Sequence, residues 1–391
     1  MEDIQTLEAI CVVFVGALVA ATAALVARQA LIVGYLIIGA ACGPHGLKLI
    51  DDPRLIEELS HIGIIFLLYL LGLSLQPRQL FQMLGEAFAV TAFSSLFIAA
   101  LVAAVALVFA FAPAEAVIVG AAMMFSSTII GLKLLPTTTL HHKHAGQVVV
   151  SVLLLQDVIA IAMLVLLETY AASQAATAVT ALASKLVALP LLFALTMAGE
   201  RWVVEPLISR FDQIQEYVFL LVIAWCLGVS VLAAAAGLSP ETGAFVAGVA
   251  LASSPVSPFI AETLRPLRDF FLIMFFFALG AEFDVASATT VIVPALLIAA
   301  VVLAGKPLAF RALLLRSGEQ RALATEVGVR LGQASEFALL IGFLALHLGL
   351  LSDRASDLIQ LSTLLTFVVS SYLVVLKFPT PIGMSPRLRR D

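Results

Sequence analysis

The chain consists almost entirely of apolar runs about as long as a bilayer is thick, and this pattern limits its fold more than any other feature. An α-helix needs about 20 apolar residues to cross the hydrocarbon core of a membrane. Thirteen such runs, joined by short connections, lie at 6–26, 31–49, 57–75, 86–112, 115–135, 146–170, 177–200, 215–236, 239–254, 265–283, 288–315, 321–349 and 356–377. With only 12% charged residues, we predict an all-α polytopic membrane protein of about 13 transmembrane helices.

The placement of basic residues predicts the orientation of these helices. If the N-terminus lies outside, 15 of the 21 Lys and Arg residues fall on the inner side. Lys48, Arg54 and Arg354 fall outside, and three others lie within runs. Because cytoplasmic loops are enriched in Lys and Arg, we predict an outer N-terminus and a short cytoplasmic tail at 378–391. No basic block points to a nucleic-acid partner.

Small-residue landmarks recur at one spacing along the chain. They are Gly34 and Gly39 against Gly243 and Gly248, Gly72 against Gly280, and Ser126-Ser127 against Ser335-Glu336, at offsets of 208 or 209 residues. The second set is shifted by seven runs, an odd number, so its copy would be inverted in the membrane. Inverted repeats are a common plan of secondary transporters. The alternative is chance recurrence of glycines in Gly-rich helices.

Two corresponding runs contain sequences that suit a break in a helix. One holds Ser126, Ser127 and Thr128 before a glycine, and the other holds Gln333 and Ser335 within the stretch GQASE. Ser and Thr compete for backbone hydrogen bonds, and Gly relaxes the chain. We expect both runs to unwind and cross near the membrane midplane, where free carbonyls can hold a cation. The alternative is ordinary helix packing through small residues.

Asp157 is a lone acid near the middle of an apolar run. Residues 144–156 and 158–167 contain no Asp, Glu, Lys or Arg, and Gln156 lies beside it. A charge at a helix centre costs roughly 2.5–3.5 kcal/mol, so such a residue is a functional candidate by default. The alternative is a buried Asp satisfied by hydroxyl groups. Because desolvation disfavours the charged form, Asp157 is expected to take either a proton or a monovalent cation, which would give electroneutral antiport.

Two further charges and a histidine cluster are candidates for supporting roles. Lys306 and Glu336 both lie deep in runs, and we expect a neutralising contact between them; alternatively, Lys306 extends to the inner interface. His141, His142 and His144 flank Lys143 in a loop, where they form either a solvated surface or a pH or metal sensor. No metal site other than a monovalent cation at Asp157, no cofactor and no enzyme constellation is predicted.

These motifs together resemble the membrane domain of the Kef-type and NapA-like cation:proton antiporters. The motifs are GYLIIGAACGPHGL, FSSTIIG, LLLQDVIAI, GLSPETGAFVAGVALASSP, FFLIMFFFALGAEFD and LGQASEFALL, in that order. The resemblance implies a homodimer in which a core domain with crossed broken helices moves like an elevator against a dimerisation domain. It also implies that Asp157 binds the ion, that Ser126, Ser127 and Thr128 lie at the crossing, and that Lys306 is the core-domain lysine.

On this pattern, residues 1–377 form the transport domain. The dimerisation part would comprise about 1–80 and 215–285, the core about 86–170 and 288–377, and a linker helix about 177–200. Two departures matter. Gln156 stands where electrogenic relatives carry a second acid, which favours potassium. The regulatory domain usual in Kef-type proteins does not follow, so we expect that the chain either acts alone or is gated by a separate cytoplasmic subunit or a removed tail. The segment GLSLQP also lacks the acid usual in that motif.

We therefore expect an inner-membrane antiporter that exchanges a monovalent cation, potassium before sodium, for a proton and contributes to pH and ion homeostasis. One alternative is a sodium:proton antiporter that uses the same site. Another is the membrane pore of a ligand-gated potassium efflux system, and a third is a transport-dead sensor subunit.

Overall fold

The computed structural model describes residues 2–27, 29–50, 53–74, 77–128, 144–173, 178–211, 213–254, 257–283 and 289–378. All regular structure in these ranges is helical. The helices are α1 Glu2–Val26, α2 Leu31–Cys42, α3 Pro53–Ser74, α4 Pro77–Val108, α5 Pro113–Met123, α8 His144–Ser173, α9 Ala178–Gly199, α10 Glu205–Phe211, α11 Gln215–Ala235, α12 Pro240–Ala252, α13 Ser257–Thr263, α14 Arg265–Glu282, α16 Ile292–Arg316, α17 Arg321–Arg330, α18 Glu336–His347 and α19 Asp353–Lys377.

The all-helical membrane fold predicted from the sequence is confirmed. Seven of the described helices are long and apolar enough to cross a membrane, and five shorter apolar helices accompany them. The run predicted at 177–200 is longer in the structure, because a π-helical turn at Glu200–Val204 joins α9 to α10 and carries the helix to Phe211. The total of thirteen spans stays a prediction, since 129–143 lie outside the described residues.

Serine side chains begin several of these helices. The hydroxyl oxygens of Ser239, Ser335 and Ser352 accept hydrogen bonds from backbone N–H groups in the first turns of α12, α18 and α19 respectively. Such caps satisfy donors that a helix start leaves unpaired. They matter most in a membrane, where water cannot replace the missing partner.

Glycine contacts show the internal repeat directly. A Cβ added to Gly39 of α2 would lie 2.1 Å from the carbonyl oxygen of Phe277 in α14, and one added to Gly248 of α12 would lie 2.1 Å from that of Tyr69 in α3. Because α12 is the counterpart of α2, and α14 of α3, these two close approaches are the same interface made twice.

Two more pairs of contacts keep the same spacing. Gly34 packs against Ala20 in α1, and Gly243, 209 residues later, packs against Val229 in α11. Likewise Gly120 of α5 packs against Ala99 of α4, and Gly328 of α17, 208 residues later, against Pro307 of α16. The repeat therefore relates α1–α5 to α11, α12, α14, α16 and α17.

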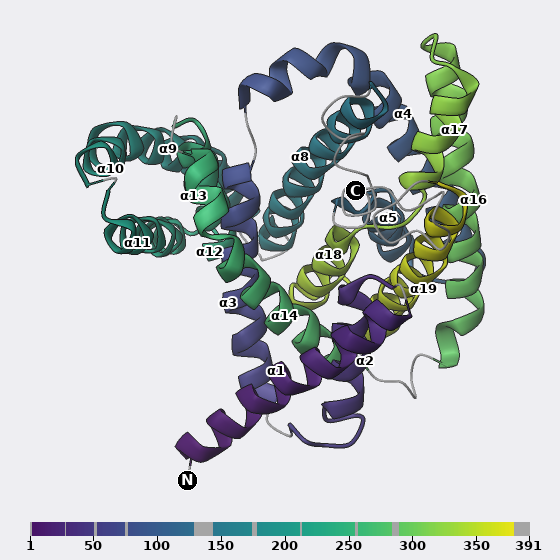
Figure 1. Ribbon diagram of the computed structural model, residues 1–391, viewed down its shortest axis with the longest axis horizontal. Helices are drawn as coiled ribbons and strands as arrows, with labels where there is room; N and C mark the ends of the chain where they lie inside the picture. Colours follow the sequence, from purple (N-terminus) through teal and green to yellow (C-terminus); the bar gives the residue numbers. More distant parts are fainter. Residues whose placement is uncertain are drawn as a thin grey trace.

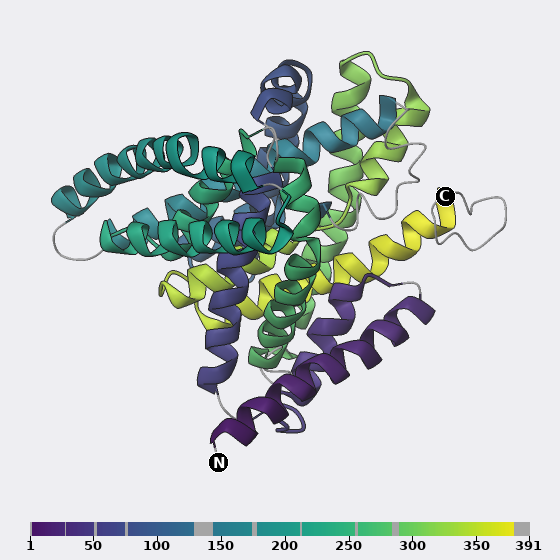
Figure 2. The same cartoon turned by 60° about the vertical axis from the view of Figure 1, so that its left-hand side comes forward.

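The broken runs lie in the middle of the fold. Figure 1 shows α5, α8 and α18 at the centre, with α16 and α17 on one side and α9–α11 projecting on the other. Figure 2, turned by 60°, keeps α9–α11 apart from α16 and α17. One hydrophobic cluster joins α2, α3, α5, α8, α16, α18 and α19, and a second joins α3, α9, α11, α12 and α14. The boundaries of a core and a dimerisation domain stay a prediction.

The glycine interface gives a stability prediction. Gly248→Ala places a methyl group against the Tyr69 carbonyl, and overpacking of this kind costs about 1–3 kcal/mol, so the melting temperature in detergent should fall. Gly228→Ala is the matched control, because nothing lies within 4 Å of a Cβ at that helical position. It should leave the melting temperature unchanged or raise it, and equal behaviour of the two variants would contradict the assigned interface.

Candidate functional site

The two interrupted runs meet at their non-helical stretches. The helix α5 ends at Met123, and the chain is non-helical from Phe125 to Ser127; α17 ends at Arg330, and α18 begins at Glu336. The hydroxyl of Ser126 donates a hydrogen bond of 2.8 Å to the carbonyl of Leu331. The sequence prediction that these stretches unwind and meet is therefore confirmed for the described residues. The continuation of the first run, from residue 129, lies outside them.

Lys306 joins the two breaks through its ammonium group. Its Nζ donates to the carbonyl oxygen of Phe125 in one break and to that of Gln333 in the other, the second at 2.8 Å. The side chain is 1% exposed. Each break leaves carbonyls without helical partners at the negative end of a helix dipole. One cation thus compensates the ends of both α5 and α17.

This arrangement replaces the ion pair expected between Lys306 and Glu336. Within the described part of the chain, the ammonium of Lys306 makes no ion pair, because backbone carbonyls already occupy it. Glu336 lies instead in the first turn of α18, half-buried, with its Oε2 3.4 Å from the hydroxyl of Ser335. Its charge still acts electrostatically on Asp157.

The middle of α8 supplies an amide and a carboxylate to the first break. The side-chain oxygen of Gln156 accepts from the backbone N–H of Ser126 at 2.9 Å, and its nitrogen donates to the hydroxyl of Ser95 in α4 at 3.3 Å. The two carboxylate oxygens of Asp157 lie 3.1 and 3.3 Å from the hydroxyl oxygen of Thr128. Asp157 is 3% exposed, so its carboxylate is enclosed in protein.

The second break receives its polar partners from α19, which the sequence analysis did not single out. The hydroxyl oxygen of Thr366 accepts from the backbone N–H of Ala334 at 3.0 Å. The hydroxyl of Ser370 donates to the side-chain oxygen of Gln333 at 3.0 Å, whose amide nitrogen lies 3.5 Å from the carbonyl oxygen of Ser127. The signal was a stripe of buried hydroxyl residues on α19, namely Ser362, Thr363, Thr366, Ser370 and Ser371.

The predicted residues thus fall into two groups. Ser126, Ser127, Thr128, Gln156, Asp157, Lys306, Gln333, Ser335 and Glu336 all lie at or beside the crossing. His141 and His142 lie outside the described residues, as does the side chain of His144. No cluster of three or more His, Cys, Asp and Glu suited to a metal ion occurs among the described residues.

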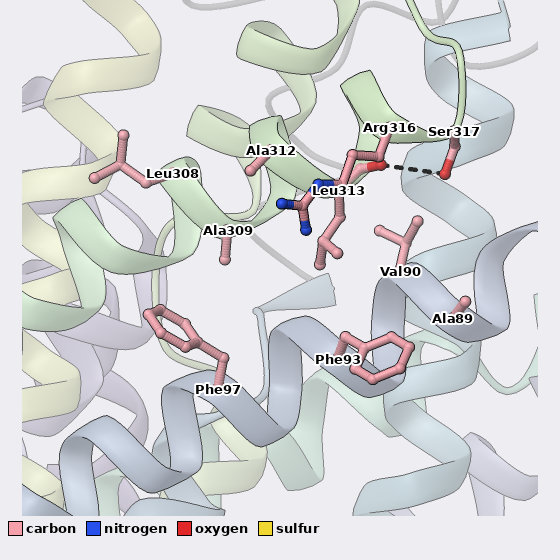
Figure 3. Close-up of a pocket in the computed structure, with 10 residues that line it drawn as sticks. All are labelled: Ala89, Val90, Phe93, Phe97, Leu308, Ala309, Ala312, Leu313, Arg316 and Ser317. Atoms are coloured by element: carbon pink, nitrogen blue, oxygen red, sulfur yellow. Dashed lines mark hydrogen bonds between the residues drawn. The ribbon is translucent and has the colours of Figure 1, made fainter.

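A groove on the outer surface lies away from this site. It has a volume of about 710 Å³ and runs between α4 and α16, lined by Phe93 and Phe97 on one helix and by Leu308 and Arg316 among others on the second (Figure 3). Phe93 and Leu308 are each 63% exposed. These side chains face outward, where a bilayer would contact them, whereas Asp157 and Lys306 face inward.

Comparison with known proteins identifies the family. A family model described as "Sodium/hydrogen exchanger, transmembrane" matches residues 11–376. The chain belongs to this exchanger family. Its curated relatives include the glutathione-regulated potassium-efflux system protein KefC of Klebsiella pneumoniae strain 342, with 28% identity over 348 residues. KefC of Enterobacter sp. strain 638 is 29% identical over 352 residues.

The exchanger's match to KefC covers 88% of this chain but 56% of each KefC protein, so the chain spans about half the length of these curated relatives. The solved structure of the sodium proton antiporter MjNhaP1 from Methanocaldococcus jannaschii at pH 8 has the same fold. It shares 15% identity with a TM-score of 0.69, over 95% of this chain and 96% of that one. The predicted resemblance to cation:proton antiporters is confirmed, and these relatives are transporters.

The position of Lys306 gives a second prediction. Lys306→Met keeps an apolar stem of similar length but leaves the Phe125 and Gln333 carbonyls without this partner. Each unsatisfied buried polar group costs about 1–3 kcal/mol, so the exchanger should lose thermal stability clearly, as measured by its melting temperature in detergent. Lys377→Met, at the exposed end of α19, is the control. An unchanged melting temperature in Lys306→Met would contradict the bridging role.

Proposed function

We propose that the exchanger swaps a monovalent cation for a proton at the carboxylate of Asp157, with potassium favoured over sodium. The observation that carries this proposal is that Asp157 is buried beside the crossing yet makes no ion pair within the described part of the chain. Lys306, the buried cation at the crossing, bonds to two backbone carbonyls instead. A mobile cation or a proton must therefore neutralise Asp157.

Competition between these two ligands produces antiport. A buried carboxylate without a counter-ion is too costly to persist, so the site would be occupied by a proton or by a cation in every conformation that crosses between the two sides. Thr128, whose hydroxyl lies within 3.3 Å of both carboxylate oxygens, is placed to supply a further oxygen ligand. Carbonyl oxygens at the break would complete the coordination.

The side chain of Gln156 supports a single exchanged charge. Its amide is neutral and already makes two hydrogen bonds within the protein. The oxygen accepts from the Ser126 N–H, and the nitrogen donates to the Ser95 hydroxyl. It therefore acts as a structural clamp and adds no second titrating acid to the site. One proton would exchange for one cation, which makes transport electroneutral. The KefC relatives, named for potassium efflux, support potassium; sodium at the same residues is the alternative.

We further propose the setting in which this exchange occurs. The chain would act as a homodimer in the inner membrane, with its N-terminus outside and its core helices moving against the dimerisation helices. The relatives are described as glutathione-regulated, which supports regulation of this exchanger, and a cytoplasmic subunit is the regulator that we propose. The competing hypothesis of a gated potassium pore predicts ion current without proton movement.

Asp157→Asn tests the centre of this proposal. The asparagine keeps the shape of the side chain but can neither be deprotonated nor carry charge, so exchange should stop while the protein stays folded. The measurement is collapse of a preformed pH gradient in proteoliposomes on addition of potassium or sodium, followed with a quenched dye. Asp353→Asn, at the exposed start of α19, is the matched control and should keep full activity. Full exchange in Asp157→Asn would remove Asp157 from the mechanism.

Electroneutrality provides a separate test. If one proton leaves for each cation that enters, the exchange rate should depend on the two chemical gradients and not on the membrane potential. Proteoliposomes with fixed ion gradients and different imposed potentials should therefore show equal rates, and electrical recording should detect no transport current. A current proportional to the rate would show unequal charges, and a current without proton flux would favour the pore.

A further inference from the structure

A second group of titratable side chains lies away from Asp157, where helices from the two halves of the fold meet. His61 belongs to α3, Glu241 to the first turn of α12, and His347 to the last turn of α18. The Nδ1 atom of His61 lies 3.6 Å from Oε1 of Glu241. The ring centroids of His61 and His347 lie 5.9 Å apart, in an edge-to-face arrangement.

A small cavity lies directly beneath this group. Its volume is about 30 Å³, room for a water molecule. The lining combines His61, Glu241 and His347 with a stripe of α18 that includes Leu340 and Phe343. The stripe begins at Leu340, four residues after Glu336, one helical turn from the crossing.

The cavity also reaches the helix that carries Asp157. Leu164 of α8 lines it, and this residue lies seven positions after Asp157, so both side chains lie on one face of α8 and two turns apart, about 10 Å. Two helices that form the site thus extend to the cavity, one from each half of the repeat.

Aromatic rings close the cavity in this conformation. Phe343 is 2% exposed. Its ring centroid lies 4.0 Å from that of His347 and 6.0 Å from that of His61. The His61 side chain is 43% exposed and that of Glu241 13%. His61 and Glu241 therefore lie at the opening of the cavity, because both line it and both are partly exposed.

We propose that Glu241 is a cation-recruiting site at the mouth of one of the exchanger's two access routes, and that His61 is its proton-dependent competitor. When His61 is protonated, its imidazolium pairs with Glu241, and the rings of His61, Phe343 and His347 hold α3, α12 and α18 together. When His61 is neutral, this competing charge is lost, and the carboxylate of Glu241, which also accepts hydrogen bonds from Ser239 and its own backbone N–H, takes a monovalent cation from solution and passes it toward Asp157.

His61 also interacts with a group other than those that line the cavity, and Glu58 lies one turn before it on α3. Among the described residues that line the cavity, the titratable groups that face His61 are Glu241 from α12 and His347 from α18. α8 contributes Leu164, and α14 contributes Phe275, which packs edge-on against Phe343. The Nδ1 atom of His347 lies 2.9 Å from the carbonyl oxygen of Phe343, which fixes the orientation of this second imidazole ring.

The proposal rests on exchange at Asp157 and is tested by transport first. The variants His61→Gln and Glu241→Gln are compared with wild type in oriented proteoliposomes, with pH varied only on the side that His61 faces. Loss of an opposite charge at a partly exposed pair changes an equilibrium by about two- to fivefold. Glu241→Gln should raise the KM for the cation from that side by this factor at alkaline pH and leave kcat unchanged.

His61→Gln should reduce the rise in KM that wild type shows when that side is acidified. The rise that remains in this variant comes from proton competition at Asp157. The matched control is His45→Gln, which changes an exposed histidine outside the cavity. If the KM of His61→Gln and of Glu241→Gln changes with pH as that of His45→Gln does, while Asp157→Asn is inactive, the proposed cation site at Glu241 is refuted. The proposed function at Asp157 then stands.

A second measurement does not depend on transport. A double-mutant cycle of His61→Gln and Glu241→Gln on the melting temperature should show coupling at about pH 5.5, where the imidazole is charged, and none at about pH 8.5. Equal coupling at both pH values, or none at either, would overturn the proton-dependent pair even if wild type showed no exchange. Inactive wild type with pH-dependent coupling would refute exchange at Asp157 and leave the pair in place.

Discussion

The structure depends on one buried ammonium group that joins two broken helices. Within a bilayer, an unsatisfied backbone carbonyl costs several kcal/mol, so two helices cannot unwind at the same depth unless their free ends find partners. Lys306 supplies that partner to Phe125 in one break and to Gln333 in the other. The helix dipoles of α5 and α17 end at the same place and offset the cost of burying the charge.

The same interaction explains why Lys306 does not pair with Asp157. The repeat gives both breaks equivalent support, since a side chain of α8, Gln156, accepts from the N–H of Ser126, and a side chain of α19, Thr366, accepts from that of Ala334. Asp157 has no acidic counterpart in the second half. A symmetric scaffold thus carries one asymmetric carboxylate, and the cation that the scaffold contains is already bound to carbonyls.

Contacts between the helices differ in kind across the fold. Around α2, α3, α12 and α14, glycines bring backbones so close that a methyl group would not fit, which locks these four helices into one packed unit. Contact between α3 and α18 includes instead the rings of His61, Phe343 and His347 over a small cavity. Rings can separate without disturbing a backbone, so this seam is where relative motion would meet least resistance.

Features that depend on local physical chemistry could be predicted from the order of the residues. Long apolar runs require membrane helices, the 208- or 209-residue spacing of glycines identifies the repeat, and hydroxyl and glycine residues mark the breaks. A single acid in an apolar run marks Asp157, because desolvation acts on each residue separately. Only the tertiary structure decided the partners. It assigned Lys306 to carbonyls rather than to Glu336, brought Thr366 and Ser370 to the second break, and placed His61 beside Glu241. The physical reason is that the helix faces that meet decide these contacts, and the order of residues 27 to 181 positions apart does not show which faces meet.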